Sequence, residues 1–172
     1  QQGPRKKVLV AGGGIGGMEA ALTAAKYGHQ VVLCEASGVL GGSIRCEEAV
    51  PFKQKLRVYL RRQALALEKA GVDVRLNTPV TPELASSLEP DVIIAAFGAR
   101  PIKPNIPGID GANVVSAEEV YKQPEKAGEK ALILGGGLVG VELAIYLHML
   151  GKQAEVVGRM EAIGGVGGSF PR

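Results

Sequence analysis

Apolar and polar positions along the chain follow two periods, which predict strands and helices in turn. A short apolar run at residues 7–11 precedes a helical pattern at 14–27, and a second apolar run follows at 30–35. These three segments form one βαβ unit. Strands that alternate with helices are typical of a parallel sheet covered by helices, so we expect an α/β protein with a Rossmann-like fold.

The same alternation continues beyond the first βαβ unit. The spacing predicts a long surface helix at 52–70, a strand at 72–76 and a buried strand at 91–98. Three prolines between residues 99 and 111 exclude a regular helix or a central strand there. We therefore predict a crossing segment, with one domain at residues 1–115 and the start of a second dinucleotide-binding unit at 116–172.

Glycines interrupt this pattern first between the strand at 7–11 and the helix that follows. Gly12, Gly14 and Gly17 satisfy G-x-G-x-x-G. Glycines in this motif allow a tight turn and a close approach of the backbone to a pyrophosphate, which the N-terminus of the helix then binds. Glu35 ends the second strand, where a carboxylate accepts hydrogen bonds from a ribose. Strand, turn, helix and terminal acid together predict a site for an ADP-containing dinucleotide.

The second glycine turn repeats the first after a shift of 123 residues. Gly135, Gly137 and Gly140 fall on the three motif glycines, and Gly158 falls on Glu35. The acid is absent and Arg159 follows, which favours a coenzyme with a phosphate on its adenine ribose, because a guanidinium pairs with phosphate and a carboxylate repels it. Arg159 as an ordinary solvated arginine stays an alternative.

Composition and charge exclude several other classes of protein. A net charge of +3 over 172 residues, without basic patches that alternate with aromatic residues, does not indicate nucleic-acid binding. No apolar run is long enough for a membrane span, and no secretory leader is evident. Cys34 and Cys46 have no metal-ligand or CxxC spacing. We expect a cytoplasmic protein without a metal site.

Several motifs in this order resemble a known family. They are GVLGGS at 38–43, AAFGARP at 95–101, IPG at 106–108 and GGGLVGVE at 135–142. With the two glycine turns, they are similar to the FAD and NAD(P) domains of the pyridine nucleotide-disulfide reductase superfamily. Within it, the chain resembles the flavoprotein region of the NADH:flavin oxidoreductase, 2,4-dienoyl-CoA reductase and trimethylamine dehydrogenase group.

The resemblance implies hydride transfer from NAD(P)H to FAD, for onward delivery to a second flavin or a substrate site. No side chain is predicted to act as a catalytic acid or base, because hydride transfer between cofactors depends on positioning. The residues that the resemblance assigns to FAD are Gly12, Gly14, Gly17, Glu35, Gly41, Gly42, Val80, Ala96 and Gly98, and those assigned to NADPH or NADH are Gly135, Gly137, Gly140 and Arg159.

The chain also departs from the family pattern. Only Cys46 follows Gly42, so the redox pair of the dithiol reductases is missing, and Phe97 stands where the family usually has threonine. The Gly-Asp motif that normally completes the flavin domain is absent too. We therefore expect a fragment of a longer enzyme, inactive alone, with an FMN-binding (β/α)8 barrel elsewhere in the parent chain.

A second hypothesis from a different class stays open. The chain is then a non-catalytic ADP- or dinucleotide-binding module that braces another domain of a larger flavoprotein. The first glycine turn serves both hypotheses, while the complete second turn favours catalysis.

Overall fold

A computed structural model describes residues 3–158 of the chain. It divides into two compact units. The first unit contains the chain up to Arg45 together with Lys55–Ile102, and the second contains Cys46–Gln54 and the chain from Lys103 onward. The domain boundary after residue 115 stays a prediction.

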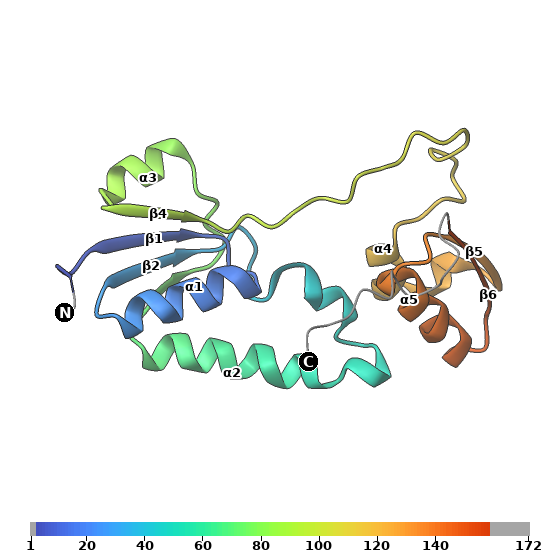
Figure 1. Cartoon of the computed structure of the whole chain (residues 1–172), viewed down its shortest axis with the longest axis horizontal. Coiled ribbons are helices and arrows are strands. Elements are labelled where there is room, and N and C mark those ends of the chain that lie inside the picture. Colours follow the sequence, from blue (N-terminus) through green and yellow to red (C-terminus); the bar gives the residue numbers. More distant parts are fainter. Residues whose placement is uncertain (1–2, 159–172) are drawn as a thin grey trace. The chain divides into compact units, whose positions relative to one another are not determined.

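The first unit is built on a parallel sheet (Figure 1). Its strands are β1 (Lys7–Ala11), β2 (Gln30–Cys34), β3 (Asp73–Arg75) and β4 (Val92–Ala95), in the order β3-β2-β1-β4. Val8 on β1 pairs with a valine on each side, Val31 of β2 and Val92 of β4. The predicted α/β fold with a parallel sheet is confirmed.

Three helices cover the two faces of this sheet. Helices α1 (Ile15–Lys26) and α2 (Lys55–Lys69) lie on one face and α3 (Pro82–Leu88) on the other (Figure 1). The core under α1 and α2 includes Val8, Val10, Met18, Leu33, Leu60 and Leu67. The core under α3 contains Leu9, Val32 and Cys34, against which Leu84 and Leu88 pack. Both faces of β1 and β2 are therefore buried, as expected for the centre of a parallel sheet.

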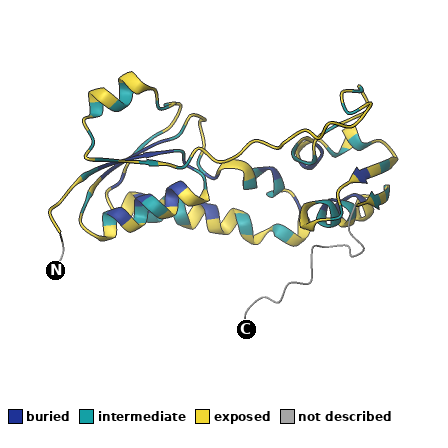
Figure 2. Cartoon of the chain, turned by 45° about the horizontal axis from the view of Figure 1, so that its top comes forward, coloured by how far each residue is buried: buried dark blue, intermediate teal, exposed yellow. Residues whose placement is uncertain are grey.

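Strand β4 is shorter and more exposed than its sequence predicts. Figure 2 shows buried residues along β1 and β2, whereas β4 alternates and leaves Ile93 52% exposed. The strand is an edge strand, which pairs only with β1 among the described residues. The predicted strand is thus found, at Val92–Ala95, but the prediction that it is buried over 91–98 is wrong, because an apolar run alone does not distinguish an edge strand from a central one.

The long helix also begins later than predicted. Residues Pro51–Lys53 form a 3-10 turn, and α2 starts only at Lys55. Val50, directly before this turn, is fully buried in the core of the second unit. The helical spacing of apolar residues thus continues across residues 52–55, where the chain passes from the second unit to the first, and the predicted helix is too long for this reason.

The described part of the second unit, which ends at residue 158, contains a two-stranded parallel sheet and two α-helices. In chain order they are α4 (Ala117–Lys122), β5 (Lys130–Leu134), α5 (Leu138–Met149) and β6 (Gln153–Val157). Ser116 and Glu119 form a capping box that starts α4. The core contains Cys46, Val50, Val120, Tyr121, Ile133, Leu143, Tyr146 and Leu147.

Candidate dinucleotide sites at the two glycine turns

The first glycine turn lies between β1 and α1, at the carboxyl end of the sheet. Gly12 has a φ of +114°, and its N–H donates to the Cys34 carbonyl (2.8 Å). A Cβ on Gly12 would lie 2.2 Å from the Ala96 carbonyl oxygen, and one on Gly17 would lie 1.8 Å from the Gly12 carbonyl oxygen. Neither position accepts a side chain, so both glycines are required for this turn.

The N-terminus of α1 opens toward solvent beyond this turn. Gly14 is the N-cap residue in an extended conformation and provides no side-chain cap, and the first turn contains no acidic residue. Ile15 and Gly16 are exposed. The first N–H groups of a helix have no partner within the helix and carry the positive end of its dipole, so this end is suited to a phosphate group.

Glu35 follows β2 and lies against the same turn. The Gly13 N–H donates to Oε2 of Glu35 (2.7 Å), while the N–H and the hydroxyl of Ser37 donate to Oε1 (2.8 and 2.7 Å). Burial alone would raise the pKa of this carboxyl, but the hydrogen bonds from Ser37 and Gly13 outweigh it and lower the pKa. The carboxylate is therefore ionised and fixed, with acceptor capacity left for the hydroxyls of a ribose.

Gly41 and Gly42 pack against the first glycine turn from a third segment. The Gly41 N–H donates to the Gly13 carbonyl (2.8 Å), and a Cβ on Gly42 would lie 3.0 Å from Cα of Gly14. Their φ angles of +121° and +61° are in the region that favours glycine. The two segments thus form one surface made largely of backbone, which allows a ligand to approach closely.

The structure brings most of the FAD residues predicted from sequence together at the first glycine turn. Ala96 and Gly98 directly follow β4, and Ala96 contacts the turn at Gly12 and Gly17. Val80 packs its side chain against the core under α3, two residues after Thr78, whose N–H donates to the Glu35 carbonyl (2.8 Å). The assignment of these residues to a cofactor stays a prediction.

The second glycine turn, between β5 and α5, repeats the geometry of the first. Gly135 has a φ of +129°, and its N–H donates to the Val157 carbonyl (2.8 Å). A Cβ on Gly140 would lie 1.9 Å from the Gly135 carbonyl oxygen. Gly137 is the N-cap of α5 at φ −76° and ψ −177°, compared with −70° and −177° for Gly14. Two segments 123 residues apart therefore form the same turn.

The two turns differ where the second strand of each unit ends. Gly158 takes the place of Glu35, and a Cβ on Gly158 would lie 3.1 Å from the Gly136 nitrogen. Among the described residues, the Gly136 N–H has no acceptor that corresponds to the Glu35 carboxylate. Arg159, the predicted phosphate ligand, lies outside the described residues.

Sequence reasoning missed two residues of the first site, Gly13 and Ser37. Gly13 gives its N–H to Glu35, and a Cβ there would lie 2.6 Å from Cδ2 of Leu40. The available signal for Gly13 was its place as the middle glycine of an unbroken run of three. Ser37, two residues after the acid, is placed to donate to it, a local pattern typical of serine in turns.

A charged cluster in the second unit joins residues 46–54 to α5. Nζ of Lys53 lies 2.6 Å from a Glu47 carboxylate oxygen and 2.5 Å from one of Glu142. Burial alone would lower the pKa of Lys53, but the hydrogen bonds to Glu142 and Glu47 outweigh it and raise the pKa. Nearby, the buried Tyr121 hydroxyl has no hydrogen-bond partner among the described residues, and burial raises its pKa to about 12.

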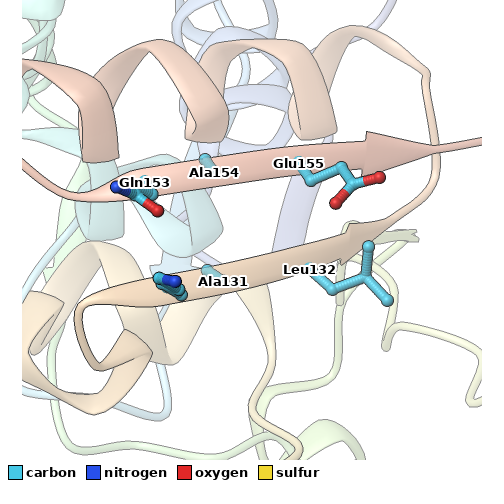
Figure 3. Close-up of a pocket in the computed structure, with 6 residues that line it drawn as sticks. Ala131, Leu132, Gln153, Ala154 and Glu155 are labelled. Atoms are coloured by element: carbon cyan, nitrogen blue, oxygen red, sulfur yellow. The ribbon is translucent and has the colours of Figure 1, made fainter.

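An open hollow in the second unit lies apart from the glycine turn. Figure 3 shows its lining along β5 and β6, which includes Leu132, Gln153 and Glu155. These residues belong to the strands themselves, whereas the turn follows the carboxyl end of β5. The hollow is therefore a surface of the sheet and not the predicted nucleotide site.

Comparison with known proteins shows the family. The model of the pyridine nucleotide-disulphide oxidoreductase family matches residues 6–168. The chain belongs to this family. Both glycine turns lie inside the matched range. The predicted resemblance is confirmed, and with it the class of FAD- and NAD(P)-binding oxidoreductases with a Rossmann-like fold.

Individual relatives support the predicted resemblance to the NADH:flavin oxidoreductase group within this family. The chain is 40% identical to the cinnamate reductase of Clostridium sporogenes over 163 residues, which are 95% of this chain and 24% of that protein. It is 40% identical to the NADH oxidase of Thermoanaerobacter brockii over 89% of this chain and 24% of that protein. The structure of a 2-naphthoyl-CoA reductase matches with a TM-score of 0.86 and 31% identity, over 94% of this chain and 24% of that one.

These matches also show how much of the relatives this chain represents. It spans about a quarter of their length. FAD and NAD(P)H are the cofactors of the family, so the predicted cofactor types are confirmed at that level. Within residues 3–158, no helix is long and apolar enough to cross a membrane, and no group of three or more His, Cys, Asp or Glu residues could hold a metal ion.

Proposed function

We propose that this chain is the part of a flavin-dependent oxidoreductase that binds FAD at the first glycine turn and NADPH or NADH at the second. The observation that carries the proposal is the repeated turn, with Gly17 and Gly140 each packed on a carbonyl oxygen of its own turn. Both turns leave a helix N-terminus without a side-chain cap. A dinucleotide pyrophosphate matches the free N–H groups of each helix.

The residues of the first unit have distinct roles in this proposal. The N–H groups that follow Gly14 hold the pyrophosphate, and the Glu35 carboxylate, already fixed by Gly13 and Ser37, orients the adenosine ribose. Gly41 and Gly42 allow the cofactor to approach the backbone. The bound flavin supplies the capacity to accept a hydride from the nicotinamide and pass it on. The protein contributes binding and orientation, on which such a transfer depends.

We also propose that the electrons continue to a second flavin or a substrate site outside this chain, with an FMN-binding barrel as the linked domain. The size of the relatives supports this, because the chain spans about a quarter of their length. For the same reason, residues 1–172 alone should not sustain NAD(P)H oxidation above a free-flavin control. We further propose a cytoplasmic location, supported by the unpaired Cys34 and Cys46.

The test is the identity and redox behaviour of the cofactor released from the natural full-length protein. We expect heat or acid to release FAD, and anaerobic NADPH or NADH to bleach the flavin absorbance of the intact protein within seconds. Release of ADP alone, with no bleaching, would contradict the proposal and favour the non-catalytic module that braces another domain.

A further inference from the structure

Phe97 is an exposed aromatic residue at the edge of the first glycine turn. It follows β4, and its backbone nitrogen would lie 3.3 Å from a Cβ on Gly12. The side chain is 74% exposed, and among the large apolar residues of the described chain only Ile102 is more exposed. Phe97 belongs to none of the cores of the described chain. Packing within the unit therefore does not explain a phenylalanine at this position.

The position of Phe97 relates it to a ligand. Ligands of open parallel sheets bind beyond the carboxyl ends of the strands, and β1, β2 and β4 all end at the sheet edge that Phe97 follows. Gly98 follows with a φ of +75°, in the region that favours glycine. The phosphate-binding turn, the ribose-orienting Glu35 and an unpacked aromatic ring thus occur at one edge of the sheet.

We propose that Phe97 binds a planar ring of the dinucleotide by stacking, an inference that rests on the proposed function of the first turn. Sites for cofactors combine a few polar groups with aromatic side chains, and a ring that stacks on a heteroaromatic ligand loses water-exposed apolar surface. Stacking of a base on an aromatic side chain typically corresponds to an affinity change of about 5- to 100-fold on substitution by alanine. Adenine and isoalloxazine share this chemistry, and the choice of ligand in the test distinguishes them.

The chain offers a matched control in Tyr27. This aromatic residue is 61% exposed in the same unit, but it is the C-cap residue of α1, directly before β2 begins, and so lies at the opposite edge of the sheet. Tyr27→Ala removes a comparable exposed ring away from the turn. Phe97→Leu keeps an apolar side chain without a π face, and Phe97→Tyr keeps the π face.

The experiment measures dissociation constants for FAD and for ADP by calorimetry on the natural full-length protein, freed of bound flavin. We expect Phe97→Ala and Phe97→Leu to weaken FAD binding about 5- to 100-fold, while Phe97→Tyr and Tyr27→Ala bind as the wild type does. An equal loss for ADP assigns the stacked ring to adenine, and an unchanged ADP affinity assigns it to isoalloxazine.

Two results would overturn the inference, and they differ from a failure of the proposed function. The inference is wrong if Phe97→Ala and Phe97→Leu bind FAD as tightly as the wild type, or if Phe97→Tyr loses as much affinity as Phe97→Ala. A wild-type protein that binds neither FAD nor ADP would instead overturn the proposed function itself, and the inference with it. Circular dichroism of each variant checks that the fold is retained.

Discussion

The chain forms the same glycine turn twice, once in each unit, and the two copies have different surroundings. In the first unit, a Cβ on Gly12 would collide with the Ala96 carbonyl oxygen 2.2 Å away, whereas a Cβ on Gly135 in the second unit would meet nothing within 4 Å. Yet the φ angles of the two glycines differ by only 15°, +114° against +129°. The turn therefore does not depend on a segment like the one that follows β4, which contacts only the first turn among the described residues.

Burial of the strands, in contrast, depends entirely on the neighbouring elements. Leu9 on β1 is 1% exposed beneath α3, while its counterpart after the 123-residue shift, Leu132 on β5, is 60% exposed. Leu132 also lines the hollow of Figure 3. Similar local sequences thus give the same backbone, while the covering helix decides which residues become core.

The strongest test of the shared turn is a methyl group at its tightest contact. We expect Gly17→Ala and Gly140→Ala each to lower the free energy of unfolding of their own unit by about 3 kcal/mol, because the new Cβ would lie 1.8 or 1.9 Å from a backbone oxygen. Amide hydrogen exchange, resolved for peptides of β1–β2 and β5–β6, measures the effect in each unit separately.

Gly16→Ala is the matched control for this pair. Gly16 lies in α1, and a Cβ there would meet nothing within 4 Å, so alanine should raise the stability slightly, by at most about 1 kcal/mol. Destabilisation by Gly17→Ala without any by Gly140→Ala would show that the two turns are not equivalent.

Removing the acid that distinguishes the first turn should affect the cofactor more than the fold. Glu35→Ala loses the acceptor for the Gly13 and Ser37 donors and for the ribose, and should weaken retention of FAD or ADP about 10- to 100-fold. Cofactor content after dialysis measures the effect. Unchanged content would contradict the assignment of Glu35.

The same carboxyl predicts a dependence on pH. Its pKa is lower in the folded protein than in the unfolded chain, so its contribution to stability is present above the unfolded value of about 4.3 and is lost as the pH falls through the folded value. Glu35→Gln, which titrates no proton here, should lack this loss. Parallel acid-denaturation curves for the two proteins would show no such difference if the hydrogen bonds of Glu35 were absent.

The distinguishing residue of the second turn should determine the choice of coenzyme. We expect the natural full-length protein to prefer NADPH, and Gly158→Glu to shift the preference toward NADH about tenfold. A carboxylate near the Gly136 N–H would accept hydrogen bonds from the ribose hydroxyls of NADH and repel the ribose phosphate of NADPH. A glutamate here needs the backbone to move by a few tenths of an ångström. Arg159→Ala should raise the KM for NADPH and leave that for NADH nearly unchanged.

The ratio of kcat/KM for the two coenzymes is the measurement for both variants. Equal use of NADPH and NADH by the wild type, or an Arg159→Ala variant that weakens both alike, would mean that Arg159 is an ordinary solvated residue.

The smallest expected effect concerns a feature of the second unit alone. Tyr121→Phe removes the buried hydroxyl that has no partner within the described chain, and keeps the ring packed 5.7 Å from that of Tyr146, so the unfolding free energy should rise by about 1 kcal/mol. The unfolded tyrosine ionises near pH 10, the folded one only near 12, so the advantage of the variant should grow over that interval. Denaturation curves at pH 8 and 11 measure it, with Tyr27→Phe as the exposed control.

Local patterns predicted the elements of the chain well. The strand at 30–35 and the helix at 14–27 are found within one residue at each end, because their limits are glycine turns that the sequence shows directly. The edge position of β4 and the late start of α2 were not predictable in the same way. Both depend on which distant segment lies alongside, and apolar periodicity is the same in either case.

The candidate site follows the same division. Gly12, Gly17 and Glu35 are predictable because each occupies a fixed place relative to a strand or helix end. The bond from Gly13 to Glu35 and the exposure of Phe97 depend on how separate segments meet at the turn. Val80 was assigned by resemblance, and only the structure shows that its side chain packs on the core under α3.

The passage of residues 46–54 into the second unit has a consequence for how the chain acquires its structure during synthesis. Cys46 and Val50 belong to the core of that unit, and Lys53 pairs with Glu142, 89 positions later. The ribosome thus releases one side of this core long before the other. The first unit contains the chain on both sides of residues 46–54, so once this unit folds it holds the two ends of that segment. The segment is then a short loop rather than a free chain, which lowers the entropy lost when α5 packs against it. No single cut in the gene therefore separates the two units intact.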